Sequence, residues 1–326
     1  MGFAPGGLVR KEHHLAATAH LYMEQIGATL PVRQLDAAAV DGGLLGAAAR
    51  GSTATFDALA EALERQPYAV VCALGAPSAL WPQLCAEGEA LWPQMAPGCV
   101  QKEDGSRISG KAPSGSRRGD KYVVSSAAIS GGSCPTLELL DLALAVVGTH
   151  LNAALVKRGL RLFKRSDPFF ACFPGDGGRY GAHFDGGGSR GCALTMIAYC
   201  SPRWHAGLGG ELQLLDEPGR CWRGVLPLAD RLVIFRAPHV LHRVAPTYAP
   251  RYALSAWWYV AAADGERGVQ AALPRAAVVL CRAGTDGNEG RSEPLDVDPE
   301  LPAQLLGTME WLCAQQRRAG KGGDGE

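Results

Sequence analysis

Between residues 169 and 260 the chain is a succession of short apolar segments that Gly, Pro and Asp interrupt at close intervals. Short segments of this kind, rich in β-branched and aromatic residues, are typical of antiparallel β-strands. The strands that we expect are residues 169–173, 179–185, 192–199, 211–215, 221–227, 231–235, 240–244 and 252–260. Such a series predicts a mainly β protein with flanking helices, built on a double-stranded β-helix (jelly-roll, cupin-like) barrel.

Two histidines and one aspartate in this region match the ligand set of a metal site. His183 and Asp185 are separated by one residue within an expected strand. Since residues i and i+2 of a strand point to the same face, both side chains can bind one ion. His242, from a later strand, would complete a 2-His-1-carboxylate site, which binds Fe(II) and leaves positions open for a cosubstrate and O2. His239 lies close enough in sequence to compete with His242 for the third position.

Arg251 stands nine residues after His242, directly before the last expected strand. The planar donors of a guanidinium match a carboxylate, so this residue is suited to bind one end of a dicarboxylate. A dicarboxylate such as 2-oxoglutarate would bind the iron with its other end. The pattern therefore predicts an oxygenase that uses Fe(II), 2-oxoglutarate and O2.

Further motifs extend over roughly residues 55–262 and are specific in combination. They are Arg118-Gly119-Asp120-Lys121, Ala171-Cys172-Phe173-Pro174-Gly175-Asp176-Gly177, Tyr180 through Asp185, Leu194-Thr195, Tyr199, Trp204, Gly209-Gly210-Glu211-Leu212, Asp230-Arg231-Leu232-Val233-Ile234-Phe235, His242-x-Val244-x-Pro246 and Arg251-Tyr252-Ala253. Together they resemble the 2-oxoglutarate-dependent prolyl hydroxylases, in particular the hypoxia-inducible-factor (EGLN-type) branch and its bacterial and protist relatives.

The resemblance implies roles for individual residues. The iron-ligand positions of the family fall on His183, Asp185 and His242. Its cosubstrate-binding positions fall on Arg251, Tyr199 and Thr195. Phe173 stands where this branch usually has a tyrosine near the cosubstrate, so that hydrogen bond is absent here. The implied cofactors are Fe(II), 2-oxoglutarate, O2 and ascorbate.

The activity that the resemblance implies is 4-hydroxylation of a proline within a protein or peptide, coupled to decarboxylation of 2-oxoglutarate to succinate. Oxygen sensing is one role of this branch. The sequence specifies neither the protein substrate nor an oligomeric state.

Other functions of the same barrel differ at particular residues. A halogenase would replace Asp185 by a small residue, and a nucleic-acid demethylase of the AlkB type would carry a second arginine where this chain has Trp257. A non-catalytic binding barrel would have lost a ligand or Arg251. A small-molecule or free-amino-acid hydroxylase stays open as the alternative, because the barrel does not fix the size of its substrate.

Composition bears on partners and location. Lys and Arg total 32, as do Asp and Glu, so no net charge attracts nucleic acid or a membrane surface. We expect no uninterrupted apolar run of the ~18 residues of a membrane span and no secretory signal at residues 1–7. The ten cysteines include no C-x-x-C pair, as in reducing compartments. These features predict no nucleic-acid or membrane partner and a cytoplasmic or nuclear location.

We expect three parts along the chain: a partly ordered N-terminal extension (1–50), the dioxygenase domain (51–265, with its barrel core at 169–262) and a C-terminal loop, helix and polar tail (266–326). Apolar periodicity predicts a helix from Thr55 to before Pro67, a second around Leu80–Trp92, and a long helix over 137–155 that braces a sheet from outside.

Two segments are expected to contact the substrate. Residues 100–117 are rich in Gly and Ser, and we expect them to be a mobile loop that closes over bound peptide. A C-terminal helix over about residues 298–316 has an apolar stripe that must be covered. This helix could pack on the outer wall of the barrel or at the rim of the active-site mouth, and the resemblance favours the rim.

Overall fold

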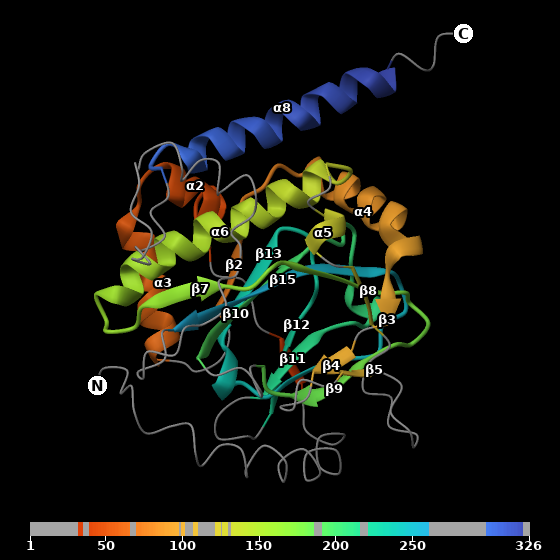
Figure 1. The fold of residues 1–326 in the computed structure, drawn as a ribbon, viewed down its shortest axis with the longest axis horizontal. Coiled ribbons are helices and arrows are strands. Elements are labelled where there is room, and N and C mark those ends of the chain that lie inside the picture. Colours follow the sequence, from red (N-terminus) through yellow and green to blue (C-terminus); the bar gives the residue numbers. More distant parts are fainter. Residues whose placement is uncertain are drawn as a thin grey trace.

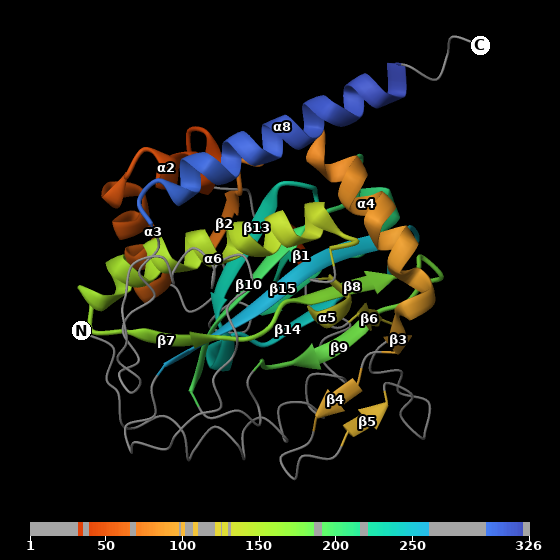
Figure 2. The same ribbon diagram turned by 45° about the horizontal axis from the view of Figure 1, so that its top comes forward.

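Two β-sheets face each other around one core in this protein (Figures 1 and 2). The computed structural model describes residues 32–34, 39–65, 70–97, 99–101, 107–109, 121–124, 126–129, 132–185, 191–215, 221–260 and 298–321. The larger sheet has the strand order β2 (Val70–Ala73), β13 (Arg231–Arg236), β10 (Cys192–Tyr199), β15 (Arg251–Val260), β8 (Phe169–Phe173), β6 (Tyr122–Val124) and β3 (Ala96–Pro97), with β7 (Leu162–Arg165) also paired to β15.

The smaller sheet has the order β1 (Val32–Gln34), β12 (Trp222–Val225), β11 (Leu212–Leu215), β14 (His242–Val244) and β9 (Tyr180–His183). Its inward side chains meet those of the larger sheet in a buried cluster that includes Leu212, Leu214, Val233 and Phe235. Each of the eight strands expected from the sequence is present. The mainly β, double-stranded β-helix prediction is therefore confirmed.

Helices cover the outer face of the larger sheet (Figures 1 and 2). They are α2 (Gly43–Ala49), α3 (Thr53–Arg65), α4 (Leu80–Leu91), α5 (Ser126–Ile129) and α6 (Pro135–Val156), and α8 (Leu301–Lys321) packs on α2 and α6. Short 3-10 helices occur at η1 (Trp92–Gln94), η2 (Ala206–Leu208) and η3 (Ala237–His239). The three helices predicted before the barrel are confirmed as α3, α4 and α6.

Helix α6 is the central element of this helical layer. It starts with Pro135, a residue suited to a first turn, and the carboxylate of Glu87 accepts hydrogen bonds from the backbone N–H groups of Thr136 (2.9 Å) and Leu137 (2.8 Å). These bonds satisfy amide groups that have no partner within a helix. They also tie α4, which carries Glu87, to the start of α6.

By length and composition α6 could cross a membrane, which the sequence-based expectation overlooked. About 72% of its most apolar stretch is buried inside the protein. It packs against α3, α8 and the larger sheet. These contacts account for its composition, and a single helix of this kind is weak evidence for a membrane span.

One glycine of α6 permits this close packing. A Cβ atom at Gly148 would lie 1.9 Å from Cζ2 of Trp258, a fully buried residue of β15. We expect Gly148→Ala to lower the free energy of unfolding by about 1–3 kcal/mol, because the ring cannot retreat in a packed core. Gly307→Ala in α8 is the matched control: nothing lies within 4 Å of its added methyl group, so it should stabilise by up to about 1 kcal/mol. Urea unfolding measures both, and equal effects at the two sites would contradict this account.

Residues 100–117 contain most of a two-stranded antiparallel sheet, β4 (Cys99–Gln101) and β5 (Arg107–Ser109), which the expected loop did not include. Residues 102–106 and 110–117 lie outside the described residues, so closure of this segment over a bound peptide stays a prediction. The expected position of the C-terminal helix is wrong. Helix α8 does not line the active-site rim. Its Leu301, Leu305 and Met309 are buried in the main core, where α8 packs on α2 and α6, on the side of α6 away from β9 (Figure 1).

The division of the chain at residues 50 and 265 stays a prediction. Helix α2, which precedes residue 50, and helix α8, which follows residue 265, both contact α6. The eight cysteines whose side chains are described are free thiols.

Candidate active site

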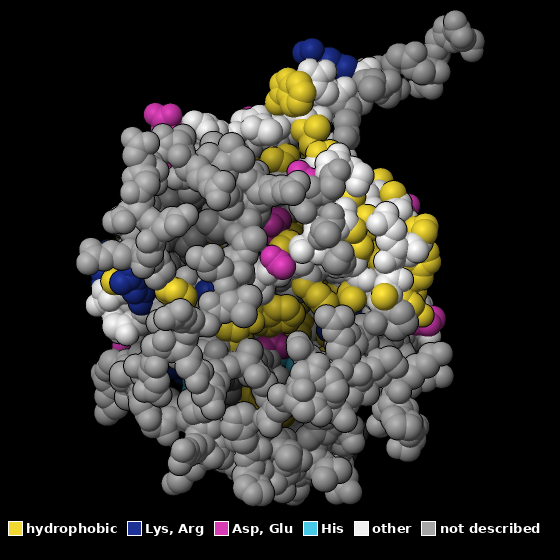
Figure 3. Space-filling view, viewed as in Figure 1, with side chains coloured by type: hydrophobic (Ala, Val, Ile, Leu, Met, Phe, Trp, Pro, Cys, Tyr) yellow, Lys and Arg dark blue, Asp and Glu magenta, His cyan; other side chains and the backbone are white. Residues whose placement is uncertain are grey.

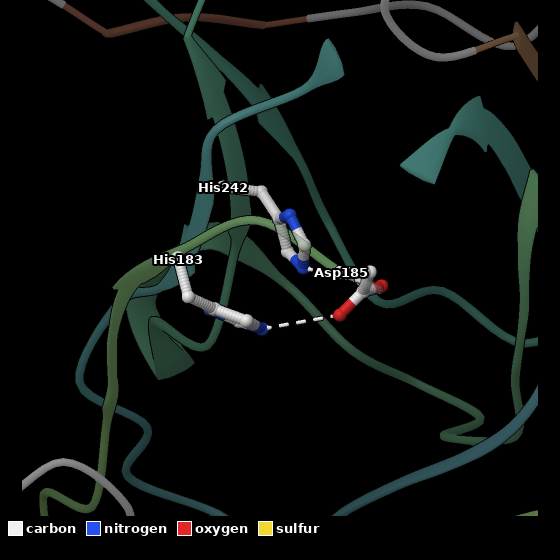
Figure 4. Close-up of side chains that lie close together, drawn as sticks. All are labelled: His183, Asp185 and His242. Atoms are coloured by element: carbon white, nitrogen blue, oxygen red, sulfur yellow. Dashed lines mark ion pairs between the residues drawn. The ribbon is translucent and has the colours of Figure 1, made fainter. Parts of the chain in front are cut away.

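Three side chains converge at one end of the barrel (Figure 4). His183 ends β9 and His242 begins β14, and the two are direct partners in the antiparallel pairing of these strands. Asp185 follows two residues after His183. Its Oδ1 lies 3.4 Å from Nε2 of His183, and its Oδ2 lies 3.6 Å from Nε2 of His242. The three ligand atoms lie within 4.8 Å of one another, which is close enough to hold one metal ion.

His239 is not part of this group. It ends the 3-10 helix η3, while His242 lies in the adjacent strand. Among the described residues, His183, Asp185 and His242 are the only such cluster of metal-binding side chains. The geometry thus favours His242 over His239 for the third position.

Backbone carbonyl groups fix the orientation of both imidazole rings. Nδ1 of His183 lies 3.0 Å from the oxygen of Gly181, and Nδ1 of His242 lies 3.0 Å from the oxygen of Val240. A carbonyl oxygen only accepts, so Nδ1 carries the proton and donates in each case. In this tautomer Nε2 carries a free lone pair on the side of Asp185. A histidine that binds a metal through Nε2 needs this tautomer.

The protonation states at neutral pH also suit a cation. Burial raises the pKa of Asp185, but its neighbours His242, His183 and Thr195 outweigh this effect, so the pKa falls well below its usual range. Burial and the charge of His183 lower the pKa of His242 to about 4, although Asp185 acts in the opposite direction. Asp185 is therefore ionised and His242 neutral, so neither must lose a proton before binding a metal.

A pocket leads from these residues to Arg251, through the space between the sheets. It is lined by Lys121, Phe169, Ala171, Phe173, Tyr180, His183, Asp185, Thr195, Ile197, Leu212, His242, Val244, Arg251, Ala253, Ser255 and Trp257. In the space-filling view, hydrophobic side chains surround a hollow in which acidic and histidine side chains are visible (Figure 3).

Arg251 is buried at the start of β15, with 3% of its surface exposed. Its Nε donates to the oxygen of Gly210 at 2.8 Å. The guanidinium carbon lies 5.2 Å from the ring centre of Phe173 and 4.9 Å from that of Tyr199. Phe173 stands where the related branch usually has a tyrosine, so it contributes an aromatic ring face to Arg251 and no hydroxyl.

The hydroxyl of Tyr199 is buried beside this guanidinium and has no hydrogen-bond partner within the described part of the chain. A buried polar atom without a partner is costly, and a bound water, ion or ligand is one explanation for it. An acceptor oxygen placed between Tyr199 and Arg251 would satisfy both. The pocket therefore fits a molecule with a carboxylate at this end and metal-binding atoms at the other.

Thr195, which the resemblance associates with the cosubstrate, has a different partner. Its Oγ1 donates to Oδ2 of Asp185 at 2.7 Å. No signal in the sequence linked these two residues.

Eleven of the sixteen residues that line the pocket were not predicted as site residues, and Lys121, Phe169, Tyr180 and Trp257 are among them. Nζ of Lys121 lies 4.0 Å from the ring centre of Tyr180 and 4.9 Å from that of Phe169. The period of two along a strand could have identified Trp257, since it shares a face with Arg251. Lys121 precedes a strand of only three residues, so it has no comparable signal.

Residues 168–259 match the family described as the 2OG-Fe(II) oxygenase superfamily. The mouse protein "Prolyl hydroxylase EGLN3" is 35% identical over 128 residues, which are 38% of this chain and 50% of that protein. The human protein "Egl nine homolog 1" is 31% identical over 185 residues, 52% of this chain and 42% of its own length. The chain thus spans about half the length of the curated relatives it matches.

A solved structure with the same fold is a prolyl hydroxylase from Trichoplax adhaerens, in complex with a peptide fragment of the hypoxia-inducible-factor oxygen degradation domain. It superposes with a TM-score of 0.51 at 20% identity, covering 63% of this chain and 91% of that one. Fe(II), 2-oxoglutarate and O2 are the metal and cosubstrates of the superfamily, and ascorbate is typical of its prolyl hydroxylases. The barrel strands of this chain, residues 168–259, therefore form a domain of the 2OG-Fe(II) oxygenase superfamily that is homologous to the EGLN prolyl hydroxylases.

Proposed function

We propose that this chain is an Fe(II)- and 2-oxoglutarate-dependent dioxygenase that hydroxylates a proline residue of a protein or peptide substrate. The observation that carries the proposal is the pairing of two groups in one pocket. His183, Asp185 and His242 converge at one end, and the buried Arg251 lies beside the unpartnered hydroxyl of Tyr199 at the other. The homology to EGLN prolyl hydroxylases supports the choice of proline.

In this proposal the two imidazole groups and the carboxylate hold Fe(II) on one face. The bound iron supplies the activation of O2 that no side chain can provide. Arg251 and Tyr199 bind the distal carboxylate of 2-oxoglutarate, and the apolar side chains of Ile197, Leu212 and Val244 line its path to the metal. These walls exclude water, which strengthens the ionic contact with Arg251.

The substrate would enter over Phe169, Tyr180 and Trp257, whose rings lie on the same pocket as the metal-binding side chains. Apolar ring faces suit a pyrrolidine ring, which offers CH groups and no N–H donor within a peptide. The solved relative that binds a peptide fragment supports a peptide substrate. A free amino acid is the alternative, and it would require a partner for its charged ammonium group.

The test is a reaction of the purified chain with Fe(II), 2-oxoglutarate and ascorbate, using a peptide library, a cell lysate and free proline in separate arms. We expect succinate formation together with a mass gain of one oxygen atom on a proline of a peptide. Oxidation of free proline alone would overturn the peptide substrate, and absence of 2-oxoglutarate turnover in every arm would overturn the enzyme itself.

Arg251→Lys should raise the KM for 2-oxoglutarate by about tenfold or more, while the affinity for the metal stays unchanged. A point charge replaces a planar pair of donors, and hydrogen bonds to charged groups contribute about 1.5–3 kcal/mol. Arg158→Lys is the control, because this arginine pairs with Glu64 at the far end of α6. An unchanged KM in Arg251→Lys would refute the role of Arg251.

A further inference from the structure

Asp185 lies beyond the last residue of β9, so strand pairing does not hold its side chain in place. Its carboxylate has three close neighbours among the described residues: His183, His242 and Thr195. The two histidines belong to the same candidate ligand set, and both would turn their Nε2 atoms to a bound ion. Thr195 is the neighbour that is not itself a candidate ligand.

Thr195 stands on a rigid part of the fold. It lies within β10, which is paired on both sides, with Phe235 of β13 and Trp257 of β15 as its direct partners. Its residue surface is 1% exposed, and a β-branched side chain has few rotamers available. The hydrogen bond to Asp185 therefore joins the ligand-bearing end of the smaller sheet to the centre of the larger sheet.

The bond also distinguishes the two carboxylate oxygens of Asp185. Oδ2 accepts from the Thr195 hydroxyl, while Oδ1 lies on the His183 side without that donor. A short hydrogen bond to a carboxylate is charge-assisted and strong, so the Thr195 hydroxyl occupies Oδ2 and leaves Oδ1 free of that donor. A carboxylate held in this way would bind a metal through Oδ1 alone.

We propose that Thr195 is a positioning residue that keeps Asp185 a monodentate ligand of the metal. The inference rests on the proposed metal centre and adds a role that the resemblance does not give, since the resemblance associates Thr195 with the cosubstrate. Three protein ligand atoms leave three positions of an octahedral ion open. A bidentate Asp185 would leave two, which 2-oxoglutarate would fill by chelation, and no position would remain for O2.

The test compares Thr195→Val, which removes the hydroxyl while keeping the shape, with Thr195→Ser, which keeps the hydroxyl. The probe is Co(II), titrated anaerobically into the metal-free full chain, with calorimetry for affinity and the visible absorption of Co(II) for coordination. We expect Thr195→Val to weaken Co(II) binding by about tenfold to a hundredfold and to change the spectrum. Thr195→Ser should keep both close to those of the unmodified protein.

Thr136→Val is the matched control. Thr136 is also fully buried, but its hydroxyl has no hydrogen-bond partner among the described residues and lies in α6, away from the pocket. Its loss should leave Co(II) binding unchanged. The inference is overturned if Thr195→Val binds Co(II) with the affinity and the spectrum of the unmodified chain. It is also overturned if Thr195→Ser weakens Co(II) binding as much as Thr195→Val does.

The failure of this inference can be separated from failure of the proposed function. If the unmodified chain binds Co(II) and turns over 2-oxoglutarate while Thr195→Val matches it, only the role of Thr195 is overturned. If the unmodified chain binds no Co(II), the proposed metal centre falls and the role of Thr195 falls with it.

Discussion

A His242→Ala protein is expected to lose 2-oxoglutarate turnover by at least about a hundredfold while it remains folded. A metal centre contributes several kcal/mol to the transition state, and each 1.4 kcal/mol corresponds to about a factor of ten in rate. His242 is 4% exposed and its ring contacts Phe235 and His183. These neighbours line the pocket or lie beside it, so the packing loss on removing the ring is modest. Turnover is measured as succinate release, and folding by circular dichroism and thermal unfolding.

His239→Ala is the control for this experiment. It removes the competing imidazole three residues away, in η3, and should leave 2-oxoglutarate turnover close to that of the unmodified chain. A His242→Ala protein with full turnover would remove His242 from the metal centre. Loss of activity in His239→Ala, with unchanged stability, would instead reassign the third ligand to His239.

Asp141→Ala is expected to destabilise the protein by about 3–5 kcal/mol, the usual effect of removing one partner from a buried ion pair. Asp141 in α6 accepts from Nη2 of Arg165 in β7, and both residues are 3% exposed. Burial lowers the pKa of Arg165 to about 10, although the charge of Asp167 acts in the opposite direction. Without Asp141 the guanidinium would be a buried charge with no counterion within α6. Urea unfolding followed by circular dichroism gives the free energy of unfolding.

The double variant Asp141→Leu with Arg165→Met separates the cost of an unpaired charge from the worth of the pair. Nε and Nη1 of Arg165 have no hydrogen-bond partner among the described residues, so the pair is only partly satisfied. Replacing both residues by apolar ones should therefore recover most of the stability that Asp141→Ala loses. A double variant as unstable as Asp141→Ala would show that the pair itself stabilises the fold.

Strand periodicity made the barrel predictable from sequence. Arg251, Ala253, Ser255 and Trp257 alternate along β15, and all four line the pocket, as a period of two requires. A strand was expected at residues 68–71, where β2 (Val70–Ala73) lies. The other short strands outside the barrel core were not predicted, because two to four residues are too few to establish a period. The predicted position of α8 was wrong for another reason. An apolar stripe shows that one face of a helix is covered, but it does not identify the surface that covers it.

The candidate site was predictable to the same degree. The spacing of two residues predicted that His183 and Asp185 lie together, and they do, although β9 ends at His183. The pattern around His242 indicated a third ligand. The bond between Thr195 and Asp185 joins strands of different sheets, and no spacing rule connects such positions. Tyr199 and Arg251 were associated through resemblance, and their side chains do lie side by side, although only Arg251 is among the residues that line the pocket.

The helical layer has a practical consequence for anyone preparing fragments of this protein. Residues 168–259 match the superfamily and include the central strands of the larger sheet. One face of this sheet packs against α6, and α6 is in turn covered by α2 and α8. A fragment cut to that match would expose Trp258, Leu254 and Leu194, all buried against the helical layer. Trimming α8 alone would uncover the faces of α2 and α6 against which it packs. Recombinant fragments should therefore retain the helices that precede residue 168 and also α8. An excised barrel would expose a continuous apolar face to water and aggregate.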